Sequence, residues 1–526
     1  MLKRLLGRVL KRTDGWVDRL YGSKWNPLYQ SGALVVLCLA VMLVTGLYLI
    51  FFYRIGAPYE SIVRIDGQPW GGRWIRALHR YAADGAVVAA VVHALRMFCQ
   101  GRSWGPRALA WTSGVFLVFL LYVCGLTGYV MVWDTHGQLL AAEGARLLDA
   151  LPLFSEPISR TFAGADPIPS AFFFMNLFLH IAVPVGIVIF LWLHVSRVAR
   201  PVLLPPRPLL WTTVGLLTGV ALVVPAALGP GADLLRLPAE VTLDVFYTFW
   251  LPWTRSAAPG VVWLAAGVAS AVAVAVPLLT RPQADRRPAP SFASTRRCTG
   301  CEQCYTDCPY DAIRMVDREG GREGKVALVN PVACVSCGIC AGSCAPMGVG
   351  PPGRTGRDQL SRVKEFVQRH PGAGEDIVLV GCGRSAAAAW AGDHARRFLV
   401  SCAGNLHTSV VEYLVRSGAR GVLIVACPSR DCWGREGPKW LVERLFHERE
   451  AELKARVDRR RVRVAHASSF DRWSLGEAMD EFATELARLD APVGDDAIEV
   501  ETECDLAESS TPQDSPLPRP GHTSGP

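Results

Sequence analysis

Two apolar stretches of this chain each carry a histidine at both ends, fourteen positions apart. The first, HRYAADGAVVAAVVH, runs from His79 to His93, and the second, HIAVPVGIVIFLWLH, runs from His180 to His194. Fourteen residues of α-helix fall about 40° short of four full turns and rise about 21 Å, which is most of the hydrocarbon thickness of a bilayer. The spacing therefore predicts two membrane helices, each with one imidazole near either side of the membrane and both on one helix face.

The rest of the N-terminal half also favours insertion into a membrane. Half of the 526 residues are hydrophobic, and six apolar runs are near the roughly 20 residues that a spanning helix needs. These runs lie at 31–52, 75–98, 109–133, 170–195, 208–228 and 259–280. Arg and Lys crowd the N-terminus and the stretches 96–107, 197–207 and 281–297. The positive-inside rule then places both termini in the cytoplasm, so that the first run points outward and the second and fourth point inward.

The matched histidines predict two stacked bis-histidine sites between two parallel helices. Such a pair suits a haem iron, which has two axial positions. A single intramembrane histidine could instead be a satisfied polar residue or part of a proton relay, but two pairs at equal spacing argue against coincidence. Glycines repeat the same spacing, with Gly32 and Gly46 on the first run and Gly114 and Gly128 on the third. Helix packing is the usual role of membrane glycines; here the shared spacing favours clearance for a haem.

Two arginines flank these sites. Arg76 lies three residues before His79, and Arg96 lies three residues after His93. From these positions each side chain is predicted to reach the propionates of a haem.

Residues 25–200 resemble the N-terminal four-helix half of cytochrome b from quinol-oxidising cytochrome bc complexes. The resemblance lies in RALHRYAA, HALRMF, WTSGVFLVFLLYVCGLTGYVMVW and FLHIAVPVG. It implies two b-type haems, an outer one held by His79 and His180 and an inner one held by His93 and His194, with quinone close to the inner haem. In that family a Pro-Glu-Trp-Tyr motif serves the outer quinol site. The nearest stretch here is LDVFYTFW, residues 243–250, in which Asp244 is the candidate remnant.

Cys38 lies between Gly32 and Gly46 on the first run. A lone membrane cysteine is most often small apolar filler. The photosynthetic branch of the cytochrome b family, however, has a cysteine at this offset that forms a thioether to an additional haem. The resemblance therefore makes Cys38 a candidate for a third, covalently bound haem, although the histidine spacing on the fourth run follows the respiratory branch.

Eight cysteines follow a linker that is rich in Pro and Arg. The first quartet has the spacing C-x2-C-x2-C-x3-C-P and the second repeats it with Ala before Pro, a pattern typical of bacterial two-cluster ferredoxins, in which each fourth cysteine ligates the other cluster. We expect one [4Fe–4S] cluster on Cys298, Cys301, Cys304 and Cys344, and a second on Cys334, Cys337, Cys340 and Cys308. Zinc is the alternative, because CxxC pairs also suit that ion.

The pattern from about residue 375 alternates short apolar strands with helices, which predicts a small parallel α/β domain. Strands are expected at IVLVGC, RFLVSC, GVLIVACP and RVRVAHA, and helices at NLHTSVVEYLVRSG and GPKWLVERLFHEREAELKARV. Four cysteines gather at or after the strand ends, where open α/β sheets bind ligands. Cys382, Cys402, Cys427 and Cys432 therefore suit a [2Fe–2S] cluster.

This last region resembles the delta subunit of methyl-viologen-reducing hydrogenases, in CAGN at 402–405 and ACPSRDC at 426–432. That family usually opens with a CxxC, whereas only Cys382 is present here. The resemblance implies a cytoplasmic partner that carries flavin or iron–sulfur centres, of the heterodisulfide-reductase or hydrogenase type.

The expected fold class is multidomain, with an all-α transmembrane dihaem bundle, an α+β ferredoxin-like two-cluster domain and a small parallel α/β domain. We expect a basic amphipathic segment at 1–24, the four-helix dihaem domain at 25–200, two further transmembrane helices at 201–281, a linker at 282–297, the two-cluster domain at 298–352, the α/β iron–sulfur domain at 372–490 and a disordered tail at 491–526 that includes Cys504.

Every recognised module carries electrons, so the sequence predicts an oxidoreductase subunit of a bacterial or archaeal cytoplasmic membrane that connects a cytoplasmic redox partner with quinone. The expected order is the α/β domain, the two [4Fe–4S] clusters, the inner haem and the outer haem. A membrane anchor and electron wire without its own quinone site is the alternative. An ion transporter is disfavoured, because Asp84 is the acidic residue found inside a membrane run and Arg80 can pair with it. The net charge of +8 is modest and falls mainly at the ends of apolar runs, so no nucleic-acid partner is expected.

Overall fold

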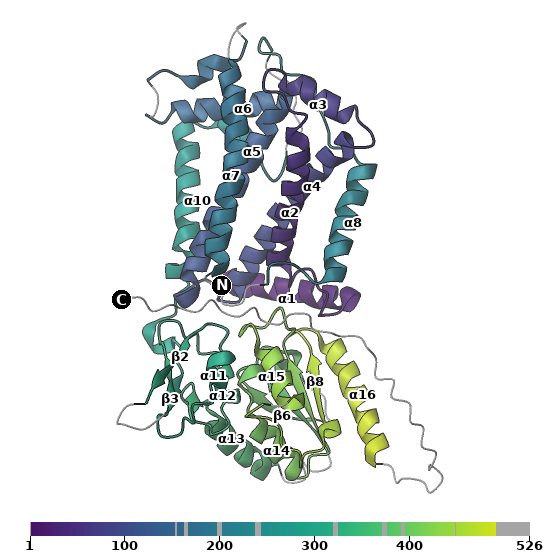
Figure 1. Cartoon of the computed structure of the whole chain (residues 1–526), viewed down its shortest axis with the longest axis vertical. Coiled ribbons are helices and arrows are strands. Elements are labelled where there is room, and N and C mark those ends of the chain that lie inside the picture. Colours follow the sequence, from purple (N-terminus) through teal and green to yellow (C-terminus); the bar gives the residue numbers. More distant parts are fainter. Residues whose placement is uncertain are drawn as a thin grey trace.

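The structure is a computed structural model of the whole chain. It describes residues 2–152, 155–162, 167–196, 202–236, 244–318, 324–370, 376–390, 395–447 and 449–490. The tail predicted from residue 491, with Cys504, lies outside the described residues. A bundle of upright helices stands on a second, mixed part formed by residues 291–490, called here the extramembrane part (Figure 1).

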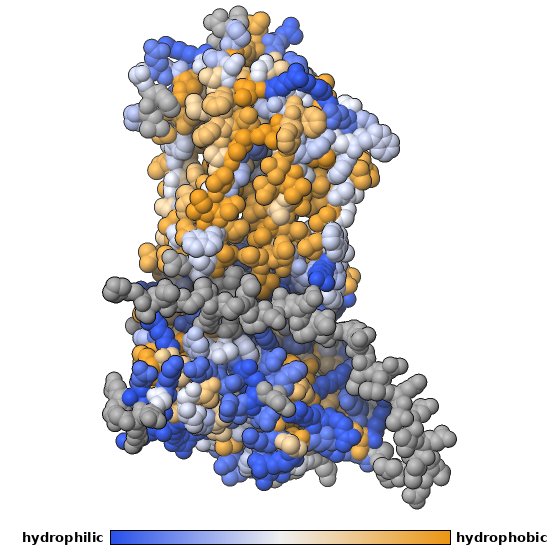
Figure 2. Space-filling model, viewed as in Figure 1, coloured by the Kyte–Doolittle hydropathy of each residue, from blue (hydrophilic) through white to orange (hydrophobic). Residues whose placement is uncertain are grey.

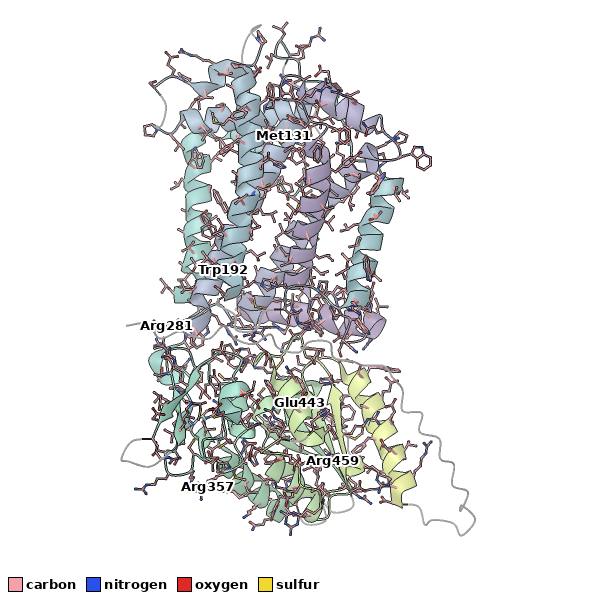
Figure 3. The ribbon with its side chains drawn as sticks, in the orientation of Figure 1. Met131, Trp192, Arg281, Arg357, Glu443 and Arg459 are labelled. Carbon is pink, nitrogen blue, oxygen red and sulfur yellow. The ribbon has the colours of Figure 1, made fainter. Side chains whose placement is uncertain are left out.

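Five helices in the described residues are long and apolar enough to cross a membrane. They are α2 (Ser31–Ile50), α4 (Gly72–Cys99), α5 (Ala108–Val132), α7 (Ser170–Ser196) and α10 (Pro259–Leu279). Their outward faces are hydrophobic, whereas the surface of the extramembrane part is largely hydrophilic (Figure 2). The bundle end that meets the extramembrane part is called the near end, and the opposite end the far end; Arg281 and Met131 are labelled close to these two ends (Figure 3).

The fifth of the six predicted membrane runs differs from the prediction. It forms α8 (Arg207–Val223), an apolar helix of 17 residues, and the chain leaves the helix at Val224 in an extended conformation. Seventeen residues rise about 26 Å, which is shorter than a hydrocarbon core of about 30 Å. The apolar residues after Val223 lengthened the run in the sequence without extending the helix, because Pro225 disfavours helix for the residue before it.

Shorter helices complete the membrane part. At the far end lie α3 (Pro58–Asp66), α6 (Thr135–Asp149) and α9 (Leu251–Ser256). At the near end the predicted basic segment forms α1 (Leu2–Tyr21), which lies across the bundle between it and the extramembrane part (Figure 1). Asp18 fixes the chain after this helix by accepting hydrogen bonds from Asn26 (2.8 Å) and Tyr29 (2.7 Å).

The first half of the extramembrane part is a small α+β unit. Strands β2 (Ile313–Asp317) and β3 (Lys325–Val329) form an antiparallel pair, and β1 (Phe292–Ala293) pairs with β4 (Val349–Gly350). Two single-turn helices, α11 (Gln303–Thr306) and α12 (Ile339–Gly342), each lie inside one cysteine quartet. A longer helix that the sequence did not predict, α13 (Gly356–Arg369), follows and begins with a capping box from Thr355 and Asp358.

The second half is the predicted parallel α/β unit. Its sheet has the order β6-β5-β7-β8, with β5 (Ile377–Cys382), β6 (Ala395–Val400), β7 (Gly421–Ala426) and β8 (Val462–His466) all parallel. Strands β5 and β7 are buried along their whole length, as a central strand covered on both faces requires. Helices α14 (Thr408–Arg416), α15 (Gly437–Phe446) and α16 (Arg472–Asp490) pack around the sheet. The predicted fold class is confirmed.

One predicted helix is too long. The run expected over 437–457 ends at Phe446, and the chain turns back so that the backbone N–H of Leu453 donates to the carbonyl of Arg444 (3.0 Å). Leu453 and Val457 are buried in the core of the α/β unit after this turn. Burial of these two side chains against the sheet takes precedence over the helical propensity of the charged sequence around them.

Candidate functional site

The four predicted haem histidines lie against the four predicted glycines. A Cβ built on each glycine would come within 3.0–3.3 Å of the imidazole ring on the neighbouring helix. The contacts are Gly32 with His93 (3.0 Å), Gly46 with His79 (3.3 Å), Gly114 with His194 (3.2 Å) and Gly128 with His180 (3.0 Å). Helix α2 therefore backs both histidines of α4, and α5 backs both histidines of α7. Such contacts are tighter than most Cβ contacts in proteins, so a side chain here would displace the ring, and the glycines give the rings room to point into the bundle.

Hydroxyl groups hold three of these rings by Nδ1. Thr45 Oγ1 lies 2.9 Å from His79 Nδ1, Thr127 Oγ1 lies 3.0 Å from His180 Nδ1, and Ser113 Oγ lies 3.1 Å from His194 Nδ1. Ligand histidines commonly use one ring nitrogen for such a bond and the other for the metal. Because Nδ1 is engaged, Nε2 is the nitrogen left to bind iron.

The sequence analysis missed these hydroxyl residues, although the sequence contains a signal for them. A Ser or Thr directly precedes each of the four glycines, in Ser31-Gly32, Thr45-Gly46, Ser113-Gly114 and Thr127-Gly128. Adjacent positions on a helix lie about 100° apart. The glycine can therefore make room for the ring while its neighbour reaches the edge of the same ring.

The geometry of one histidine pair fits a metal between two imidazoles. The ring centres of His79 and His180, called here the far pair, lie 6.3 Å apart. Two imidazole nitrogens that bind one metal from opposite sides at about 2 Å each place their ring centres about 6 Å apart. His93 and His194, the near pair, lie against Gly32 and Gly114 at the end of the bundle closer to the extramembrane part. The far pair therefore fits a bis-histidine haem, and the near pair has the same glycine backing.

The two arginines that were predicted to reach haem propionates both bind carboxylates of the protein in the structure. Arg76 forms a two-point contact with Asp66, at 2.6 Å for both nitrogens, and also donates to the carbonyl of Ala226. Arg96 is 2% exposed and binds Asp14 on α1 (2.5 Å). Contact with haem propionates stays a prediction for both arginines.

Cys38 is 3% exposed and lies in an apolar cluster with Ala86 and Leu121. Its Sγ would lie 3.4 Å from a Cβ built on Gly85 of α4. This packing is compatible with a filler role, and the thioether haem stays a prediction.

A polar cluster lies beside the far pair, with Arg80 and Asp84 following His79 along α4. Arg80 pairs with Asp84, as the sequence predicted, and also with Asp244. The carboxylate of Asp244 further accepts from the Tyr129 hydroxyl (2.7 Å) and from the backbone N–H groups of Phe246 and Tyr247, at 2.7 Å each. Both oxygens of Asp244 are thus already engaged.

The eight cysteines of the α+β unit line two cavities in the predicted combinations. The first cavity is lined by Cys298, Cys301, Cys304 and Cys344. The second is lined by Cys308, Cys334, Cys337 and Cys340. In the residues that the structure describes, no group of three His, Cys, Asp or Glu side chains converges closely enough for one metal ion. The thiols are therefore spread around two cavities, and the crossed fourth cysteines match the two-cluster pattern.

The four cysteines of the α/β unit lie in two pairs beyond the carboxyl edge of the sheet, and are called here the four-thiol group. They form two contacting pairs: Cys382 and Cys427 lie 3.5 Å apart (Sγ–Sγ), and Cys402 is hydrogen-bonded to Cys432. A Cβ on Gly437 would lie 3.0 Å from Cys402 Sγ and 3.1 Å from Cys432 Sγ, so this glycine keeps the space open. The thiol of Cys427 donates to Cys382 and thereby holds the pKa of Cys382 below its ordinary value.

The two cysteine-bearing units are packed tightly against each other. Asn405 donates to the carbonyls of Gly338 and Arg354, both at 3.0 Å. Arg444, which is 1% exposed, donates to Ser343 Oγ (2.9 Å) and to the carbonyl of Gly404 (2.8 Å). All three cysteine sets therefore belong to one interlocked body.

Three family models match the chain, in the predicted order. Residues 16–200 match the model for cytochrome b/b6/petB, residues 297–348 the 4Fe-4S dicluster domain, and residues 387–490 the delta subunit of methyl-viologen-reducing hydrogenase. The predicted combination of a cytochrome b region, a two-cluster region and a hydrogenase delta-like region is confirmed.

Individual relatives match the membrane part. Cytochrome b6 of Synechococcus sp. (strain JA-3-3Ab) is 27% identical over 178 residues, which are 33% of this chain and 83% of the relative. The menaquinol:cytochrome c reductase cytochrome b subunit of Bacillus subtilis (strain 168) is 28% identical over 146 residues, 27% of this chain and 65% of the relative, so less than two thirds of that relative is spanned. A solved structure, Hyperthermophilic respiratory Complex III, has 18% identity and a TM-score of 0.36 over 49% of this chain and 78% of that one. The family models and the five long apolar helices make the chain a multi-pass membrane protein and an electron-transfer component of the oxidoreductase class.

Substitution of a backing glycine should remove one haem. In Gly128→Leu the new side chain collides with the His180 ring, because even a Cβ would lie 3.0 Å from it. The purified variant should therefore hold one b haem per chain where the wild type holds two, measured by pyridine haemochrome and protein concentration. Gly219→Leu on α8 is the matched control, since a Cβ there meets nothing within 4 Å. Two haems in Gly128→Leu would contradict the assigned role of this glycine.

Proposed function

We propose that this chain, in which a cytochrome b region is joined to a two-cluster region and a hydrogenase delta-like region, passes electrons between a cytoplasmic redox partner and the quinone pool. The carrying observation is that two bis-histidine sites and three cysteine sets occur in one chain whose bundle touches the extramembrane part directly. Haems and iron–sulfur clusters, when bound, supply one-electron carriers. In this assignment both termini and the extramembrane part lie in the cytoplasm.

The side chains of the protein provide the ligands and the surroundings for such carriers. Imidazoles fixed through Nδ1 present Nε2 to the two haem irons. Cysteine sulfurs surround the two cavities and form the four-thiol group, whose two contacting pairs suit the two irons of a [2Fe–2S] cluster. Burial of these sites excludes water, which strengthens the influence of neighbouring charges on them.

The partner and the quinone follow from the resemblances. The hydrogenase delta-like region supports a cytoplasmic partner of the hydrogenase or heterodisulfide-reductase type. The cytochrome b region supports a quinone that exchanges electrons close to the near pair.

The second candidate function is a membrane anchor that conducts electrons without a quinone site of its own. One observation argues against an outer quinol site. Asp244 is the candidate remnant of the Pro-Glu-Trp-Tyr motif that serves the outer quinol site in the cytochrome b family. Here Arg80, Tyr129 and two backbone N–H groups bind the Asp244 carboxylate. An outer quinol site is therefore not part of the proposal.

Quinone reduction by the isolated chain tests the proposal. Full-length protein in lipid nanodiscs, reduced through its iron–sulfur centres by reduced methyl viologen, should pass electrons to a membrane-soluble menaquinone analogue. His93→Ala should lose most of that rate, because the near pair no longer holds a haem. If the haems are fully reduced but no quinone is reduced, the second candidate, an electron-conducting anchor without a quinone site, is the one supported.

The cofactor content provides a second test. Anaerobic preparations should hold about ten non-haem irons per chain, as two four-iron clusters and one two-iron cluster. Cys427→Ser should lower this to about eight and abolish only the two-iron signal in electron paramagnetic resonance (EPR) spectra. Loss of a four-iron signal in this variant would show that Cys427 serves a different centre.

The candidate haem at Cys38 has its own test. Denaturation releases b-type haems, whereas a haem bound through a thioether stays with the chain. A haem-stained band on a denaturing gel, present in wild type and absent in Cys38→Ala, is the outcome that a third haem requires. An unstained wild-type band from cells that contain haem-attachment factors leaves Cys38 as filler.

A further inference from the structure

The four-thiol group lies at the junction with the bundle, which is not the order expected from the sequence. Asp431 directly precedes Cys432. Its carboxylate is bound by Arg96, in the last turn of α4, and by Gln100, the residue after that helix. Arg96 lies three residues after His93, about 4.5 Å along the helix axis. The chain of contacts from the near pair to the four-thiol group thus needs one helical turn and one ion pair.

A second arginine reinforces this contact. Arg102 donates from its guanidinium to the backbone carbonyl of Cys432 itself. Its Nε is buried and has no hydrogen-bond partner among the described residues. Arg102 lies nine residues after His93 in the sequence and ties the segment after α4 to a cysteine of the four-thiol group.

Two arginines contact Trp433, the residue after Cys432. The Trp433 ring has the Arg107 guanidinium 5.1 Å from its centre and that of Arg384 4.9 Å from it. Arg107 also donates to the carbonyl of Trp433 (3.1 Å). Asp431, Cys432 and Trp433 are thus each bound by the segment 96–107, which fixes the four-thiol group against the near end.

The α+β unit reaches the bundle by a longer route. Its contact is the hydroxyl of Tyr310, which lines the second cysteine cavity and accepts from Arg107. From there to Gly114, which backs His194, α5 continues for six residues beyond Ala108, about 9 Å along its axis. This rise is about twice that of the route through Arg96.

The cysteine sets follow one another away from the membrane. A Cβ on Gly434 would lie 3.4 Å from Cys402 Sγ and 3.6 Å from Cys337 Cβ, so the four-thiol group adjoins the second cavity. The two cavities adjoin through the short helices α11, which carries a cysteine of the first cavity, and α12, which carries a cysteine of the second. The first cavity is therefore last in the series.

We propose that the four-thiol group is the direct neighbour of the near pair, and that electrons enter or leave the membrane through it. The two ferredoxin-like sites then connect it with the soluble partner. This inference rests on the proposed electron-transfer function and reverses the expected positions of the cysteine sets. Each electron that crosses the junction would oxidise one of the two centres, on the four thiols or at the near pair, and reduce the other by one electron. No atom is transferred.

The test is a magnetic measurement on the full-length, anaerobically purified protein. Irradiation of the oxidised protein at 77 K adds electrons to the clusters while the haems of many molecules remain ferric. A nearby ferric haem speeds the spin relaxation of a reduced cluster, which appears as a higher half-saturation power in EPR. The two-iron signal should show the largest enhancement. It should lose this enhancement in His93→Ala and keep it in His79→Ala, the matched change at the far pair.

Two outcomes would overturn the order. In one, a four-iron signal shows the larger enhancement in the wild type, a comparison that needs no variant. In the other, the enhancement of the two-iron signal persists in His93→Ala and disappears in His79→Ala. Failure of the proposed function is distinct, because it appears as absent haem or cluster signals rather than as a changed ranking among signals that are present.

Discussion

The contact of an imidazole ring with a helix position that lacks a side chain is the constraint on which the membrane part depends. Each of the four rings lies 3.0–3.3 Å from where a Cβ would be, and extra atoms in such a packed site typically cost about 1–3 kcal/mol. The helix pairs are set by these contacts, with α2 behind α4 and α5 behind α7. The hydroxyls of Thr45, Ser113 and Thr127 then settle which ring nitrogen faces inward. Position and chemistry of the histidines thus come from adjacent residues on the partner helix.

The near end connects this bundle to the cysteine-bearing units through buried charge. Arg96 binds Asp14 and Asp431 with 2% of its surface exposed. Removing one partner of a buried pair is typically costly by about 3–5 kcal/mol, because a charge is left uncompensated. Burial raises the pKa of Asp14 to about 6, and the Arg96 guanidinium opposes that rise. The orientation of the extramembrane part is therefore specified by a small number of polar residues.

Much of this arrangement was predictable because it depends on local spacing. The fourteen-residue repeat identified the histidines and glycines, and the cysteine spacing identified both cavities, including the exchange of Cys308 and Cys344. Features set by long-range packing were not predictable. Leu453 and Val457 end α15 early by joining a core built from distant strands, and Arg96 finds Asp431 across 335 positions of sequence. The order that we propose for the cysteine sets differs from the expected one for the same reason: in the sequence the ferredoxin-like quartets follow the membrane helices, whereas in the fold the loop around Cys432 contacts the end of α4.

Helix α1 has a consequence for the order in which the molecule is assembled. Its contacts include Phe470, whose ring centre lies 5.9 Å from the Lys11 ammonium and which a Cβ on Gly15 would approach to 3.8 Å. At ribosomal rates of about 5–20 residues per second, Phe470 is synthesised about 20–90 s after α1. During that interval the helix needs another surface to cover its apolar side. Leu5, Val9, Trp16 and Leu20 remain exposed even in the finished fold, so α1 can rest on lipid during synthesis and keep that attachment when the last domain closes over its other face.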